Sequence, residues 1–98
     1  MAHASKVIAG IAWFSRDQWQ LLRSLAADAE KLEATHAEWE TAAEKAIRDL
    51  TRRGVAVRKV NVDVNELHAW CLTQARPLDG SARAAYAMAQ LPDDTERA

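Results

Sequence analysis

Two short apolar runs along the chain are separated and followed by longer segments in which apolar residues recur at helical spacing. Residues 7–13 and 55–62 are rich in valine, isoleucine and alanine, and each run is shorter than an ordinary helix. Runs of this kind are typical of strands that are buried on both faces or that lie at a subunit contact. Elsewhere apolar residues return every three or four positions, which predicts amphipathic helices. The expected order is therefore strand, helix, helix, strand, helix, helix.

The segment between the two runs begins with a capping signal and contains two predicted helices. Ser15 and Gln18 have the spacing of a capping box, so the first helix is expected to start there. Asp28 is a good N-cap for a second helix over residues 29–53, where opposite charges recur four residues apart. Another capping box begins at Thr35, so a later start for the second helix remains open.

Residues 54–74 form the stretch around which the other elements are expected to be arranged. Gly54 suits the left-handed residue that commonly ends a helix, and the second apolar run follows it. The valines of that run change phase at Arg58 and Lys59. This change indicates either that both faces of the strand are covered or that the strand contains a bulge.

Two more helices are predicted after the second strand. Asp63 is placed to cap the first of them, with Glu66 completing a capping box, and Pro77 stops it. Asp79 or Ser81 is placed to cap the second. The residues expected to face the core are Val64, Leu67, Cys71, Ala75, Ala82, Ala85, Tyr86 and Ala89.

The length of 98 residues, with 49% hydrophobic and 28% charged side chains, predicts one globular domain, 1–98. Residues 1–6 and 92–98 are expected to be flexible tails. The expected fold class is α/β, with α+β as the alternative, and the long helical connection permits parallel strands. A two-stranded sheet is marginal by itself and has apolar edges, so we expect a homodimer, which can complete the sheet. Its contact is expected to be formed by residues 7–13, by residues 55–62 or by a helical tryptophan face.

Charge and cysteine content narrow the classes of function. The net charge of −1 favours neither nucleic acid nor an anionic membrane, and no segment has the roughly 20 apolar residues of a membrane span. The single cysteine excludes an internal disulfide and fits the reducing cytoplasm. Glycine-rich phosphate loops, Cys-x-x-Cys, His-Glu-x-x-His and a serine nucleophile elbow are absent. The sequence therefore predicts no cofactor and no catalytic residue, and it leans against an enzyme.

The best candidate site lies where the two predicted strands end. If the strands are parallel, the residues after the first strand come close to those after the second, where ligands bind in open α/β sheets. The candidate ligand-binding residues are Trp13, Ser15, Arg16, Asp63, Asn65 and His68. The competing interpretation is two adjacent N-caps with aromatic packing, because no base–nucleophile pair is evident among them.

Two groups near this site have the residue types of metal ligands. Asp63, Asn65 and Glu66 offer oxygen ligands for a hard cation, but capping explains the two carboxylates. His68 and Cys71 lie on one helix face and resemble a metal or Cys–His pair. A closed metal site needs further ligands, and cysteine is often buried, so we favour packing and predict no metal.

Basic residues surround the predicted glycine stop. They are Arg52, Arg53, Arg58 and Lys59. A phosphate or nucleic-acid surface is one interpretation. Cations are also expected at a helix C-terminus, and charges on an edge strand prevent unwanted pairing, so nucleic-acid binding is the less favoured interpretation.

The motifs of this chain occur in an order that resembles that of a group of known proteins. The motifs are Ile11-Ala12-Trp13-Phe14, Trp19 with Leu22, Trp39, Val60-Asn61-Val62-Asp63, Leu67-x-x-Trp70-Cys71 and Asp79-Gly80-x-Ala82-Arg83-x-x-Tyr86. With these motifs the chain resembles a group of short, uncharacterised bacterial proteins of similar length, over most of residues 8–91. The resemblance implies a bacterial cytoplasmic source, and it brings no activity, cofactor or catalytic residue.

Three functional hypotheses follow. The first is a non-enzymatic protein-interaction module that acts as a homodimer and offers a tryptophan-bearing apolar face to a protein partner. The second is a small-molecule-binding protein or hydrolase that uses the strand-end crevice near Trp13, Ser15 and Asp63. The third is nucleic-acid binding through the stretch from Arg52 to Lys59.

Overall fold

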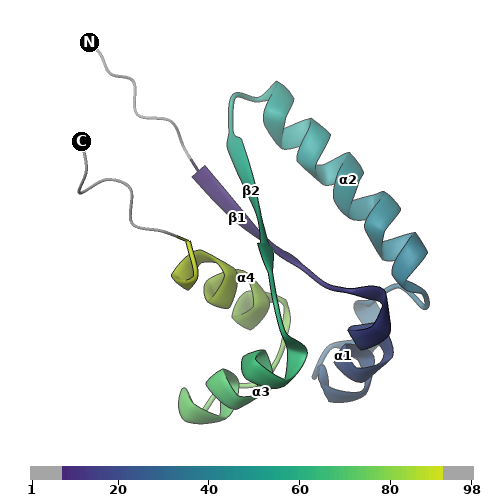
Figure 1. The fold of residues 1–98 in the computed structure, drawn as a ribbon, viewed down its shortest axis with the longest axis vertical. Helices are drawn as coiled ribbons and strands as arrows, with labels where there is room; N and C mark the ends of the chain where they lie inside the picture. Colours follow the sequence, from purple (N-terminus) through teal and green to yellow (C-terminus); the bar gives the residue numbers. More distant parts are fainter. Residues whose placement is uncertain (1–7, 92–98) are drawn as a thin grey trace.

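The computed structural model describes residues 8–91 of the chain (Figure 1). The elements are β1 (Ile8–Trp13), η1 (Arg16–Gln18), α1 (Trp19–Leu25), η2 (Ala29–Lys31), α2 (His36–Arg52), β2 (Ala56–Asn61), α3 (Val64–Thr73) and α4 (Gly80–Ala89), where η marks a short 3₁₀ turn. The predicted order and the α/β fold class are confirmed. The predicted tails, 1–6 and 92–98, lie outside the described residues.

The two strands form a parallel pair whose register runs without interruption from Ile8 opposite Ala56 to Trp13 opposite Asn61. The strand direction, which the sequence left open, is therefore settled, and the alternative of a bulge in the second strand is wrong. In Figure 1, α2 and α4 lie on opposite sides of the strands, where α2 contacts β2 and α4 contacts β1.

The core lies at the carboxyl end of the sheet, among α1, α3 and α4. Its buried residues are Phe14, Trp19, Leu22, Val62, Val64, Leu67, Cys71, Leu78, Ala82, Tyr86 and Ala87. Most of the predicted inward residues of α3 and α4 are among them. Ala75 and Ala89 are exposed, because Ala75 lies beyond the end of α3 and Ala89 is in the last turn of α4.

Three predicted signals at helix ends are confirmed. The carboxylate of Asp63 accepts from the amides of Asn65 and Glu66 at the start of α3, although the Glu66 side chain does not complete the predicted capping box, and that of Asp79 accepts from the amide of Ala82 in α4. Gly54 has a φ of +89°, the left-handed conformation that glycine adopts without strain, directly after α2.

Two other predicted caps are wrong, and in each case a side chain of the predicted cap bonds to a distant segment, Gln18 in the first and Asp28 in the second. Ser15 makes no capping bond, and Gln18 instead accepts from the amide of Val64, 2.9 Å away. Asp28 also makes no capping bond, because Arg83 of α4 occupies both of its oxygens. The long helix therefore starts late, behind the complete capping box at Thr35.

Candidate functional site

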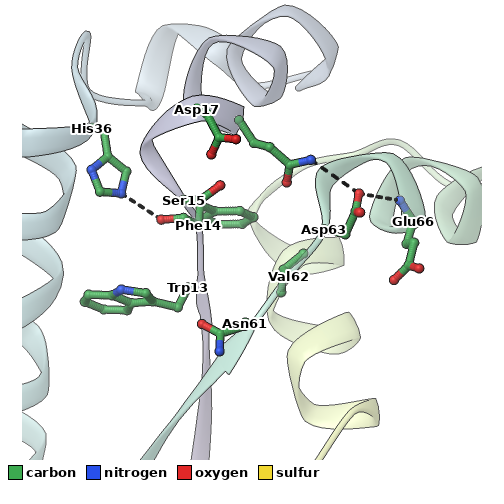
Figure 2. Close-up of a pocket in the computed structure, with 10 residues that line it drawn as sticks. Trp13, Phe14, Ser15, Asp17, His36, Asn61, Val62, Asp63 and Glu66 are labelled. Atoms are coloured by element: carbon green, nitrogen blue, oxygen red, sulfur yellow. Dashed lines mark hydrogen bonds between the residues drawn. The ribbon is translucent and has the colours of Figure 1, made fainter.

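A hollow of about 690 Å³ lies where β1 and β2 end, at the carboxyl edge of the parallel sheet (Figure 2). Its lining consists of Trp13, Phe14, Ser15, Asp17, Gln18, His36, Asn61, Val62, Asp63 and Glu66. Because the strands are parallel, the residues following each strand meet at this edge, as they do in ligand-binding α/β sheets.

The structure brings three of the six predicted site residues to the hollow: Trp13, Ser15 and Asp63. Arg16, Asn65 and His68 are not part of its lining. Arg16 lines a separate, smaller hollow beside Trp19. Asn65 and His68 follow Asp63 along α3 at positions that turn away, whereas Glu66 returns to the side of the hollow. Ligand binding at these residues stays a prediction.

His36 is the lining residue that sequence reasoning missed most clearly. Its Nε2 atom lies 2.7 Å from the carbonyl oxygen of Phe14, so the first residue of α2 is fastened to the end of β1. The sequence placed His36 inside a longer helix. The capping box at Thr35 was the signal that this residue begins a helix and so faces a different neighbour.

Gln18 joins the two strand ends across the hollow. Its Oε1 atom accepts from the amide of Val64, and its Nε2 atom donates to the Asp63 carboxylate at 3.4 Å. The same carboxylate oxygen accepts from the amide of Asn65 at 2.8 Å. Gln18 and Asp63 therefore fix the position of α3 relative to β1.

The hollow is acidic. Asp17, Asp63 and Glu66 line it, and its lining contains no lysine or arginine. Within residues 8–91, the side chains of Asp17 and Glu66 make no hydrogen bond or ion pair. All three carboxylates lie at the start of a helix or 3₁₀ turn, where the backbone dipole stabilises negative charge. The backbone dipoles therefore favour carboxylates at these positions, and the carboxylates make the hollow acidic.

The described groups do not form a catalytic arrangement. The Ser15 hydroxyl makes no hydrogen bond within the described residues, and the Nε2 atom of His36 is held by a backbone carbonyl. Figure 2 shows the second ring nitrogen of His36 turned away from Ser15. Burial raises the pKa of the Cys71 thiol, which disfavours a reactive thiolate. Among residues 8–91, no three His, Cys, Asp or Glu side chains gather to hold a metal ion.

An aromatic cluster supports one wall of the hollow. The ring of Trp39 lies 4.8 Å from that of Trp13 and is stacked on Trp19 at 5.2 Å, measured between centroids. The Nζ atom of Lys59 lies 4.1 Å above the Trp13 ring. The large aromatic side chains therefore hold α1 and α2 against the end of β1.

The basic stretch after α2 is partly neutralised. Lys59 pairs with Glu44 of α2 at 2.9 Å, and Arg52 pairs with Asp49 on the same helix. A nucleic-acid surface needs a continuous basic field, and these pairs interrupt it. The contacts disfavour this hypothesis.

No family model, curated protein or solved structure matches the chain. Among the described residues, no helix is both long and apolar enough to span a membrane.

Proposed function

We propose that the protein is a non-enzymatic interaction module that acts as a homodimer. The exposure of the sheet carries the proposal: each strand has six residues, and Gly10 is the only one of them that is buried. Parallel sheets are ordinarily covered on both faces. The single chain therefore leaves part of its sheet for a partner to cover.

The long helix supports the same proposal. α2 has seventeen residues and an apolar stripe, yet none of its residues is buried. The stripe consists of Trp39, Ala43, Ile47 and Leu50, all of them half-buried. Within residues 8–91, only the carboxyl end of the sheet has a closed core, so the amino end is the incomplete part of what the structure describes. A second copy is the partner that supplies matching strands to a two-stranded sheet.

Sedimentation equilibrium over a range of concentrations tests the proposal. We expect the molecular mass of a dimer at micromolar concentration, because the chain alone leaves its strands half-exposed. A chain denatured in urea is the reference for the monomer mass. A folded, stable monomer at these concentrations would contradict the proposal.

The hollow favours binding of a small organic cation as a second candidate function. Its lining combines three carboxylates, those of Asp17, Asp63 and Glu66, and contains no lysine or arginine. Carboxylates that lie close together attract ammonium groups. This candidate keeps the predicted ligand site at the strand ends. It does not include the hydrolase alternative, because the hollow offers no activated nucleophile.

Tryptophan fluorescence during titration with putrescine tests this candidate. We expect saturable quenching, and Asp63→Asn is expected to weaken binding roughly tenfold through loss of one charge-assisted contact. Asparagine is also a good N-cap, so the helix is preserved. Uncharged 1,4-butanediol is the control ligand. Equal responses to the diamine and the diol would rule out recognition of a cation.

A further inference from the structure

Building on the proposed homodimer, we propose that the second copy pairs with the outer edge of β1. The two β1 strands run antiparallel, which gives a four-stranded sheet in the order β2-β1-β1-β2. The partner is a second copy of this chain, and the edge is defined by the outward backbone groups of Ile8, Gly10 and Ala12. The other outer edge, that of β2, is less favourable because its strand carries Arg58 and Lys59.

Backbone directions identify these outward groups. The amide of Val62 donates to the carbonyl of Trp13, so both residues point into the space between the strands. Backbone groups alternate along a strand. Ile8, Gly10 and Ala12 therefore point away from β2. The amide of Gly10 agrees with this direction, because it donates to the Met88 sulfur of α4 at 3.1 Å.

The same alternation makes Val57, Lys59 and Asn61 the outward residues of β2. This edge is charged, since Arg58 and Lys59 are both exposed. A symmetric antiparallel pairing centred on Lys59 would place two lysines opposite each other, which is unfavourable. Charges on an edge strand are a known protection against pairing. β1, with the sequence IAGIAW, has no charged residue.

Exposed apolar side chains mark the β1 edge. Ile8 is 38% exposed and Met88 is 48% exposed, and these are two of the three large apolar side chains exposed within the described residues. The third, Leu72, lies on α3. Met88 contacts Gly10, two positions along the strand from Ile8. The apolar exposure therefore adjoins the uncharged edge.

Met88 covers this edge weakly. A thioether sulfur is a poor acceptor, and the methionine side chain is flexible. The carbonyl of an incoming strand is a better acceptor for the Gly10 amide. In an antiparallel pairing centred on Gly10, Ile8 lies opposite Ala12 of the second copy and Gly10 lies opposite Gly10. The pairing is self-complementary, as a twofold interface requires.

Two proline variants distinguish the edges by sedimentation equilibrium. Ile8→Pro removes an outward amide of β1, and Val57→Pro removes an outward amide of β2; neither amide belongs to the β1–β2 ladder. We expect Ile8→Pro to raise the dimer dissociation constant at least about tenfold, since both copies lose a hydrogen bond. Val57→Pro is expected to leave it within about twofold. The reverse result, or no effect of Ile8→Pro, would overturn the proposal.

Two helix-surface variants give an independent measurement if a proline disturbs folding. Met88→Lys places a charge at the β1 edge and is expected to give a folded monomer. Leu72→Lys makes the same change at an exposed apolar site away from that edge, and it is expected to stay a dimer. A dimer in both variants would overturn the β1 edge and leave the homodimer intact. A monomeric wild-type protein would overturn the homodimer itself.

Hydrogen exchange identifies what covers the edge. We expect the amides of Ile8, Gly10 and Ala12 to exchange more slowly as protein concentration rises. Protection that does not change with concentration would mean that a terminal segment of the same chain, residues 1–7 or 92–98, occupies the edge. That result would overturn the proposal.

Discussion

Replacing Trp19 by alanine is expected to lower the free energy of unfolding by about 4 kcal/mol. Trp19 is 1% exposed, its indole N–H donates to the carbonyl of Glu33 at 3.1 Å, and its ring stacks on Trp39. The truncation leaves a cavity and an acceptor without its donor. Small domains have only about 5–15 kcal/mol of stability, so the variant is expected to unfold at a far lower urea concentration.

Two variants serve as controls in the same urea titration, followed by circular dichroism. Trp19→Phe keeps most of the ring volume and loses the indole hydrogen bond, so an intermediate loss is expected. Leu72→Ala removes a side chain that is 68% exposed and should change stability by no more than about 0.5 kcal/mol. Equal stability of Trp19→Ala and the wild type would contradict the position of Trp19 at the centre of the core.

Replacing Arg83 by leucine is expected to cost about 3 kcal/mol of stability. Its two Nη atoms each lie 2.9 Å from an oxygen of Asp28, and the side chains are only 14% and 16% exposed. The variant leaves the Asp28 carboxylate partly buried without its cation. Arg52→Leu breaks the more exposed pair with Asp49 and should cost about 0.5 kcal/mol or less.

The effect of Arg83→Leu is expected to depend on pH. Hydrogen bonds from Arg83 hold the pKa of the Asp28 carboxyl below its usual value of 3.8. The folded state thus binds the proton less tightly than the unfolded state, so the pair contributes fully above the usual pKa. The contribution is lost as pH falls through the lowered pKa. The stability difference between wild type and Arg83→Leu should therefore shrink below about pH 4. A difference that grows in acid would contradict this linkage.

Local signals predicted the helix ends correctly where the partner of each group is close in sequence. Gly54, Asp63 and Asp79 act within a few residues, and the structure confirms all three. Ser15 and Asp28 fit the same local rules but do not cap. The oxygens of Asp28 are bound by Arg83, 55 residues away, and no capping rule includes that competitor.

The candidate site shows the same division. Trp13, Ser15 and Asp63 converge because they lie at or just after the ends of two parallel strands. The sequence allowed parallel strands but did not determine their direction. His36 joins them because α1 and η2 carry the chain back past the end of β1 before α2 begins. The position of His36 in the hollow depends on that path of the chain. The residues adjacent to His36 in the sequence do not indicate the path.

The sequence by itself determined the order of the elements, most of their core faces and the confirmed caps. These features depend on periodicity and on hydrogen bonds between near neighbours. Each of them can therefore be read from residues that lie close together in the sequence. Only the tertiary structure decided the strand direction, the makeup of the hollow and the half-exposed state of the sheet. Those features depend on how α1, α3 and α4 close one core at the carboxyl ends of the strands. That closure leaves the two strands with one buried residue, Gly10, and the outer edge of β1 is the one that we propose a second copy covers.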